Sequence, residues 1–275
     1  MFVKSPLFVD WPREERGMLL ACWRAVFAVV ALAPLVRSPR FQWRLVPMAL
    51  SFVMMNGCFL QSMVWTTAGN AIWLQNIAPL WICLFVRLSG ETLDRRDIPM
   101  LVFVSTGIGL ILVCELAETD WSADAPRGVL LGFLSGIGYA LVIYFLRKLR
   151  DVDSAWLITV NLASTAVVFG AAPMVTGIWP HGVQWPVLAA FGAVQLAAPY
   201  FLFAKGLKKI SSQEGACLGL LEPVLVPVWV FVLYRERPEW WTAVGGGLIL
   251  AGLLYRYWPR PSSEVPAAVA SKTNL

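Results

Sequence analysis

The sequence predicts an all-α, polytopic integral membrane protein, and three observations lead to this fold class. Of the 275 residues, 58% are apolar and only 14% are charged, whereas soluble domains average about 25% charged residues. The apolar residues form long runs with short spaces between them, and most Lys and Arg residues lie in alternate spaces. A water-soluble fold of this length has too little interior to hide so much apolar surface.

The apolar runs define the expected helices in chain order. About 20 residues of α-helix cross the hydrocarbon core of a bilayer, because each residue adds roughly 1.5 Å. Nine runs reach this length, and the spaces between them leave no room for a soluble domain. The tail from Pro259 is small, polar and Pro-bearing, which is typical of a disordered segment. The predicted spans cover residues 17–36, 45–65, 70–88, 98–114, 128–146, 154–176, 185–204, 215–234 and 240–258.

Basic residues predict how these spans are oriented. Fifteen of the 22 Lys and Arg residues lie in one set of alternate connections, and the positive-inside rule makes that set cytoplasmic. The C-terminus is then inside and residues 10–16 are outside. The net charge of +5 therefore indicates topology rather than a nucleic-acid partner. The fifteen are Arg37, Arg40, Arg44, Arg87, Arg95, Arg96, Arg147, Lys148, Arg150, Lys205, Lys208, Lys209, Arg256, Arg260 and Lys272.

Small residues recur along the span at 128–146. Gly128, Gly132, Gly136 and Ala140 stand four residues apart, so they share one face of the helix. In lipid, apolar burial drives helix association only weakly, and such faces let helices approach closely. We therefore interpret these glycines as scaffold rather than as a binding site.

Two segments of the chain repeat each other, residues 70–109 and residues 214–256. Each contains a helix with a proline in its middle, a short loop with an acidic residue, and a Gly-rich helix. Repetition at this scale indicates two related structural units. With a one-residue gap, the alignment pairs Pro79 with Pro223, Glu91 with Glu236, and Gly107 with Gly252.

The two units are expected to have opposite orientations. The basic connections put Glu91 on the cytoplasmic side and Glu236 on the outer side, which is the inverted-repeat plan of many secondary transporters. An inverted pair needs an odd number of helices in each unit. The second unit has five predicted helices and the first has four, so one helix before Gly17 is expected to be missing or incomplete.

The sequence resembles a known family. The features that carry the resemblance are A-C-W-R-A-V-F-A-V-V with Arg24, L-L-E-P-V at residues 220–224, R-E-R-P around Glu236, and G-G-G-L-I-L-A-G at residues 245–252. Together they resemble the EamA-type branch of the drug/metabolite transporter superfamily. The spacing between these motifs is more specific than any one of them.

The resemblance implies ten helices arranged as two inverted five-helix repeats, of which this chain has nine complete transmembrane helices. The expected divisions are a first, N-terminally truncated repeat at 1–119, a second repeat at 120–258 and a disordered cytoplasmic tail at 259–275. The first residues, M-F-V-K-S-P-L, look like the last turns of the family's first helix. The implied activity is export of metabolites or amino acids.

Glu222 is the sharpest candidate for a functional residue. A carboxylate near the middle of a membrane helix is costly, so it normally faces a polar cavity or a partner. Pro223 follows it and frees the carbonyl of Gly219 from its helical hydrogen bond. Three interpretations stay open: Glu222 binds a substrate amine or a proton, it is a structural carboxylate that bonds a neighbouring helix and holds the kink, or it is exposed to lipid.

The corresponding helix of the first repeat offers a second candidate. Trp73, Asn76 and Leu80 lie on one face, and Pro79 frees the carbonyl of Gln75. Broken helices at matching places in two halves are the best sequence indicator of a transport site. The alternative is that Asn76 makes an interhelical hydrogen bond and Trp73 only packs.

Further polar residues lie at membrane depth, and Pro199 predicts another irregular helix next to Gln195. Each of these residues alone is more often interhelical packing than a ligand. Arg24 lies deep in its span and must pair or reach the membrane surface; the sequence leaves open whether it reaches the outer mouth or pairs with a carboxylate such as Glu222. The predicted cavity lining is Asn56, Trp73, Asn76, Tyr139, Asn161, Gln195 and Glu222, with helix breaks at Pro79, Pro199 and Pro223.

The sequence carries no catalytic, cofactor or metal motif. Its one histidine, His181, lies in a short outer loop, and no nucleophile motif, zinc motif or nucleotide fingerprint is present. We therefore expect no enzyme activity, no cofactor and no metal, and any driving force must come from a gradient or from exchange. The five cysteines are scattered through apolar spans and are interpreted as small apolar residues. They are Cys22, Cys58, Cys83, Cys114 and Cys217.

These observations predict a secondary-active carrier of the bacterial inner membrane that exports small organic metabolites, such as amino acids, by alternating access. Its partners are a small-molecule substrate and the lipid bilayer. The alternative is a non-transporting or inactive scaffold that results from loss of the first helix; a channel is disfavoured because no filter segment is visible. The sequence leaves open whether the carrier is a monomer or a homodimer.

Overall fold

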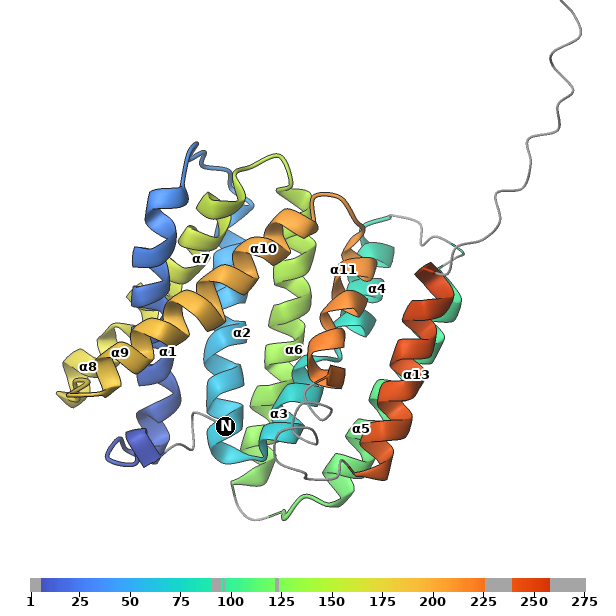
Figure 1. Ribbon diagram of the computed structural model, residues 1–275, viewed down its shortest axis with the longest axis horizontal. Helices are drawn as coiled ribbons and strands as arrows, with labels where there is room; N and C mark the ends of the chain where they lie inside the picture. The colour runs from blue at the N-terminus through green and yellow to red at the C-terminus, as the bar shows by residue number, and fades with distance from the viewer. Residues whose placement is uncertain (1–5, 91–94, 96, 122–123, 226–238, 258–275) are drawn as a thin grey trace, which may run out of the picture.

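The computed structural model describes residues 6–90, 95, 97–121, 124–225 and 239–257, and these residues form helices with no strand among them. Most of the helices lie side by side and run between two ends of the molecule, while α10 (Ala198–Gly206) crosses them obliquely (Figure 1). The tail 259–275, the acidic loop residues Glu91 and Glu236 of the repeat, and residues 226–234 of one predicted span lie outside the described residues.

The helices follow the predicted spans closely. The helix that covers the first predicted span begins at Arg13. A single turn, η2, precedes it, and Phe8 and Trp11 in this region are buried. In chain order the elements are η2 (Pro6–Phe8), α1 (Arg13–Leu32), η3 (Ala33–Leu35), α2 (Leu45–Trp65), α3 (Ala68–Gln75), α4 (Ala78–Leu88), α5 (Asp97–Ala117), α6 (Ala125–Lys148), α7 (Ser154–Phe169), α8 (Ala171–Thr176), α9 (Gln184–Ala190), η4 (Phe191–Ala197), α10 (Ala198–Gly206), α11 (Ser212–Gly219) and α13 (Trp240–Tyr257).

Seven helical stretches in the described part of the chain are long and apolar enough to cross a membrane. They are Arg13–Leu35, Leu45–Trp65, Ala68–Leu88, Asp97–Ala117, Ala125–Lys148, Ser154–Thr176 and Gln184–Gly206. The molecule is therefore a multi-pass membrane protein. The count of nine spans and the inverted relation of the two halves stay predictions.

The predicted basic connections gather at one end of the helices. Figure 1 shows the connections 36–44, 149–153 and 207–211 at the same end as the last residues of α4 and α13. Successive spans therefore run in alternate directions, as the charge pattern predicts. Which side of a membrane this end faces stays a prediction from the positive-inside rule.

Glycines on α6 bring it into backbone contact with α2 and α3. A Cβ at Gly128 would lie 2.8 Å from the backbone of Thr66, and a Cβ at Gly136 would lie 2.6 Å from the carbonyl oxygen of Leu74. Gly132 is equally tight, since its Cβ would lie 2.8 Å from the Leu74 side chain. The small face predicted from the sequence is therefore the packing surface of α6.

A second glycine contact joins α5 to α13, which Figure 1 shows side by side. Gly107 and Gly245 face each other, because a Cβ on either would lie 2.5 Å or 2.7 Å from the other's carbonyl oxygen. Gly252 packs on Phe103 and Met100 of α5 in the same way. The glycine runs of both repeats thus pack on one another.

A buried ion-pair network ties three helices together near the basic end. Arg256 at the end of α13 donates from Nε to Asp97 at 2.8 Å and from Nη2 to Glu214 at 2.7 Å. The Asp97 and Glu214 side chains are only 4% and 14% exposed. Glu214 also closes a capping box with Ser211 at the start of α11. One guanidinium therefore fixes the ends of α5, α11 and α13 relative to each other.

Replacing Gly136 by Ala is expected to lower the unfolding free energy by about 1–3 kcal/mol, because the new methyl group meets the Leu74 backbone rather than a flexible side chain. Gly109→Ala is the matched control, since nothing lies within 4 Å of its Cβ position; it should be neutral or stabilising by up to about 1 kcal/mol. Thermal unfolding in detergent measures both. Equal stability of the two variants would contradict the packing of α6 described here.

Replacing Arg256 by Met leaves two carboxylates buried without their cation, and it should destabilise the fold by about 3–5 kcal/mol. The control is Asp124→Asn, which breaks an exposed ion pair with Arg13 whose side chains are 56% and 44% exposed. That change should cost no more than about 1 kcal/mol. If both variants unfold at the same temperature in detergent, the network does not hold α13 in place.

Candidate functional site

Two helices are interrupted at the places where the sequence repeat aligns its prolines. The span 68–88 breaks between α3 and α4 at Asn76 and Ile77, and Pro79 lies in the first turn of α4. α11 ends at Gly219, and after a turn at Leu220 the residues 221–225 are helical again, with Pro223 among them. The prolines therefore stand just after each break, where their missing N–H leaves no unpaired donor.

A third irregularity lies in the span 184–206. The segment η4 (Phe191–Ala197) is a π-helix, and it leads into α10, which carries Pro199 in its first turn. π-helical segments inside α-helices are frequent at functional sites. η4 packs closely on α1, because a Cβ at Gly192 would lie 2.6 Å from the carbonyl oxygen of Arg24.

Glu222 follows the α11 break and is solvent-accessible in the structure. It lies within electrostatic reach of two tyrosines from other helices, Tyr139 of α6 and Tyr200 of α10. The end of α11 lies close to Tyr139, since a Cβ at Gly219 would lie 3.1 Å from the Tyr139 hydroxyl. The residue with the strongest functional signal in the sequence therefore lies in the same electrostatic neighbourhood as two phenol groups.

Tyr200 connects this group to the first half of the chain. Its hydroxyl lies 3.7 Å from the Sδ of Met55, and its ring meets the ring of Phe52 edge-on at 5.1 Å. It also interacts electrostatically with Arg24, which is only 6% exposed. Arg24, Tyr139, Tyr200 and Glu222, which we call the central polar group, come from α1, α6, α10 and the segment after α11.

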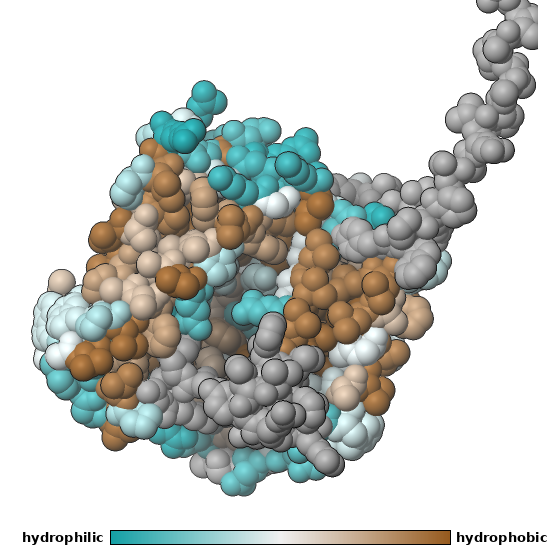
Figure 2. All heavy atoms as spheres, viewed as in Figure 1, coloured by the Kyte–Doolittle hydropathy of each residue, from teal (hydrophilic) through white to brown (hydrophobic). Residues whose placement is uncertain are grey.

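The surface is hollowed in the middle of the molecule. Figure 2 shows a recess between the regions of α10 and α11, with hydrophilic residues at its margin and more apolar surface around it. A concave site with a few polar groups in an apolar surround is the usual form of a small-molecule site. The hollow lies in the same region as the helices that supply the central polar group.

Two predicted site residues, Asn56 of α2 and Asn161 of α7, are buried, and atoms of their side-chain amides lack hydrogen-bond partners among the described residues. They are 5% and 0% exposed. Among the described residues, the Nδ2 of Asn56 and both amide atoms of Asn161 have no hydrogen-bond partner. Buried amides are normally paired, and α2 and α7 pack against each other and against α1. These amides therefore keep unused hydrogen-bonding capacity inside the bundle.

The structure does not bring Trp73, Asn76 or Gln195 into contact with the central polar group. Trp73 is 4% exposed and belongs to an apolar cluster of α5, α11 and α13 side chains. Asn76 donates from Nδ2 to the Ile72 carbonyl of its own helix at 2.8 Å. Gln195 is exposed on η4. The placement of Trp73 favours its packing interpretation, whereas the Asn76 hydrogen bond is local to its own helix and not the interhelical bond of the alternative.

Sequence reasoning missed Tyr200. It follows Pro199 directly, inside a predicted span, and a hydroxyl next to a predicted helix break at membrane depth was the signal that could have found it. Arg24 was recognised as unusual, but its place beside Tyr200 required the packing of α1 on the α10 region. Arg24 lies 198 residues from Glu222 in the sequence, whereas Tyr200 lies only 22 residues from it.

Comparison with known proteins agrees with this architecture. Residues 126–257 match the EamA-like transporter family. Two proteins of Archaeoglobus fulgidus, each described as an uncharacterized transporter, are similar in sequence: one is 28% identical over 69% of this chain and 67% of its own length, and the other is 23% identical over 90% and 82%. A crystal structure of a protein aligns with a TM-score of 0.72 at 18% identity, over 88% of this chain and 87% of that chain.

These similarities define a membrane transporter built from apolar helices. The EamA-family match over residues 126–257 and the transporter relatives support an EamA-type protein of the drug/metabolite transporter superfamily. The solved structure supports the fold alone, because its sequence identity is low.

The buried amide of Asn161 generates a stability prediction. Asn161→Leu removes a buried polar group without a partner, so the unfolding free energy should stay unchanged or rise by about 1–3 kcal/mol. Gln75→Leu is the comparison, because Gln75 donates to the Ser135 hydroxyl at 2.8 Å; it should lose about 1 kcal/mol. Thermal unfolding in detergent tests both. Strong destabilisation by Asn161→Leu would mean that its amide holds the fold.

Proposed function

We propose that the protein is a secondary-active exporter of small organic metabolites of the amino-acid type, and that it works by alternating access. The observation that carries the proposal is the central polar group, in which Tyr200 lies within electrostatic range of both the Glu222 carboxylate and the Arg24 guanidinium, and Tyr139 within range of Glu222.

This group has the chemistry that a zwitterion needs. A carboxylate attracts an ammonium group, and a guanidinium binds a carboxylate through its fork of N–H donors. The faces and hydroxyls of the two tyrosines suit a small amphipathic body between those charges. Because Arg24 is buried, its interaction with a carboxylate is stronger than it would be in water. The buried amides of Asn56 and Asn161 supply further donors and acceptors.

Alternating access is supported by the breaks in α3–α4 and after α11. Such paired breaks, with prolines aligned by the internal repeat, let each half bend around a shared site. We propose that the units 1–119 and 120–258 rock against each other and expose the site to each side in turn. Trp73 and Gln195 would then reach the solute in another state of the cycle.

The proposed setting is the bacterial inner membrane, with the C-terminus and the basic end of the helices in the cytoplasm. A reporter fused at Asp120 is expected to signal from the outer side. A cytoplasmic signal from that fusion would reverse the proposed orientation, and with it the direction of transport.

Glu222→Gln is expected to lower uptake into proteoliposomes at least a hundredfold while the variant keeps its thermal stability, because the amide cannot balance a bound ammonium or carry a proton. Glu118→Gln is the matched control: Glu118 is exposed near the other end of the helices, and its variant should transport normally. A well-folded Glu222→Gln protein with normal uptake would disprove the proposed role.

A second measurement separates the two roles of Glu222. Solutes are first found by thermal stabilisation of the detergent-solubilised protein across a metabolite panel. For any hit, loss of both counterflow and gradient-driven accumulation in Glu222→Gln indicates solute binding. Retained counterflow with lost accumulation indicates proton coupling.

A further inference from the structure

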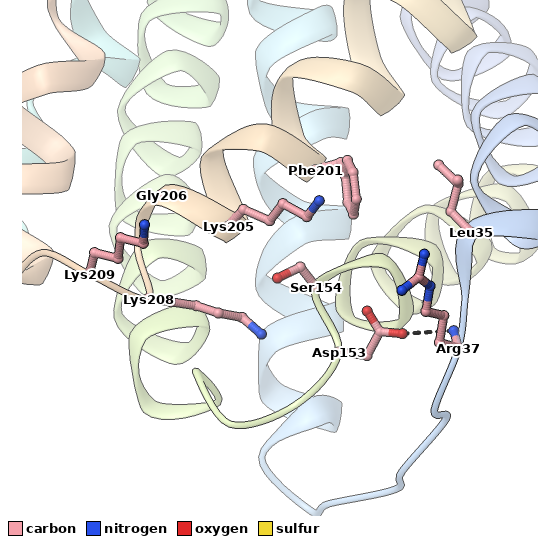
Figure 3. A pocket seen from close by; sticks show the side chains of 9 residues that line it. All are labelled: Leu35, Arg37, Asp153, Ser154, Phe201, Lys205, Gly206, Lys208 and Lys209. Atoms are coloured by element: carbon pink, nitrogen blue, oxygen red, sulfur yellow. Dashed lines mark hydrogen bonds between the residues drawn. The ribbon is translucent and has the colours of Figure 1, made fainter.

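A pocket separate from the central polar group opens at the basic end of the helices. It has a volume of about 690 Å³ and lies where η3, the start of α7 and the end of α10 meet (Figure 3). Its charged lining consists of the cations Arg37, Lys205, Lys208 and Lys209 and the single carboxylate Asp153. The pocket therefore carries three positive charges in excess, four minus one.

Asp153, the carboxylate in the pocket, already accepts hydrogen bonds from the backbone. Asp153 accepts hydrogen bonds from the backbone N–H of Arg37 at 2.8 Å, of Ser38 at 3.3 Å and of Ala155 at 3.0 Å. Burial alone would raise the pKa of Asp153, but these N–H groups and the nearby Lys208 charge bring the pKa below its ordinary value. Asp153 thus stays ionised, and its hydrogen bonds hold the 36–44 connection against α7. It therefore competes only weakly with a bound anion for the lysines.

Ser154 supplies an unused hydrogen-bonding group in the same place. It is 3% exposed, and its hydroxyl has no partner among the described residues. In Figure 3 this hydroxyl points into the space between Lys205 and Lys208. It is the first residue of α7, where the positive end of the helix dipole favours an anion. A buried serine hydroxyl without a partner, facing cations at a helix start, has the features of an anion site.

The other wall of the pocket is apolar and reaches the outside of the bundle. Leu35 is 50% exposed, and Phe201 lies under the Lys205 ammonium, which is 4.4 Å from its ring centroid. Leu202, next to Phe201 on α10, is 64% exposed. An anion that filled this pocket would therefore have one end among lysines and the other beside apolar side chains at the membrane boundary.

We propose that this pocket binds the phosphate headgroup of an anionic glycerophospholipid, with the acyl chains alongside Leu35 and Phe201. Basic pockets between helices at the cytoplasmic boundary are suited to such headgroups. A free phosphate ion would use the lysines and Ser154 but not the apolar wall, so the combined lining favours the lipid. The site is independent of the proposed solute and can be tested without transport.

The test measures lipid binding to the purified full chain by native mass spectrometry and by thermal stabilisation. Phosphatidylglycerol and phosphatidylcholine with identical acyl chains are compared, with inorganic phosphate and glycerol 3-phosphate as soluble probes. We expect phosphatidylglycerol to bind at least tenfold more tightly than phosphatidylcholine. Equal binding of the two lipids would overturn the proposal, and so would binding of either soluble probe as tight as that of phosphatidylglycerol.

Variants locate the site. Lys205→Gln/Lys209→Gln changes two exposed side chains of the pocket and should weaken phosphatidylglycerol binding at least tenfold. Arg40→Gln/Arg44→Gln removes the same charge from the same end of the molecule, outside the pocket, and should leave the affinity unchanged. Equal losses in both variants would mean general charge attraction and would overturn the site.

Ser154→Ala tests the hydroxyl separately. It removes a buried group that makes no hydrogen bond within the described residues, so folding should be preserved, as the unfolding temperature in phosphatidylcholine will show. We expect a threefold or greater loss of phosphatidylglycerol affinity. An unchanged affinity would remove Ser154 from the site and contradict the proposed headgroup position.

Discussion

The structure depends on one constraint: inside a bilayer, every backbone N–H and C=O that leaves its helical hydrogen bond must be covered by other protein. Three stretches leave regular α-helix at membrane depth, at Asn76 and Ile77, in η4, and at Leu220. Backbone groups freed in such segments have to be covered by neighbouring helices, as η4 is covered by α1 at Gly192. The position of the irregular backbone is therefore the basis of the proposed solute site.

Close packing of the regular helices makes this arrangement possible. Gly128, Gly132 and Gly136 bring α6 onto the backbones of α2 and α3, and Gly107 with Gly245 brings α5 onto α13. Dispersion and helix contact replace the hydrophobic effect, which is weak between helices in lipid. A bundle fixed by such contacts, and by Arg256 at the helix ends, can carry breaks in the remaining helices.

Much of the fold could be predicted because hydropathy and charge act along the chain. The span expected at 45–65 coincides with α2, and the prolines at 79, 199 and 223 mark the irregular segments within a few residues. The site was harder to predict. Glu222 stands out in the sequence because a membrane carboxylate is costly. Trp73 and Asn76 also lie next to a helix break, yet Trp73 packs in an apolar cluster and Asn76 donates to a carbonyl of its own helix.

The sequence by itself determined that this protein spans a membrane several times, which connections share an end, and where its helices break, because length, hydropathy and proline act locally. Only the tertiary structure decided which residues meet. Tyr200 lies within electrostatic range of Arg24 and Glu222, and Arg37, Ser154 and Lys205 line one pocket. These groups are more than a hundred residues apart at their extremes, and their meeting depends on how the helices pack and cross, which no local pattern encodes.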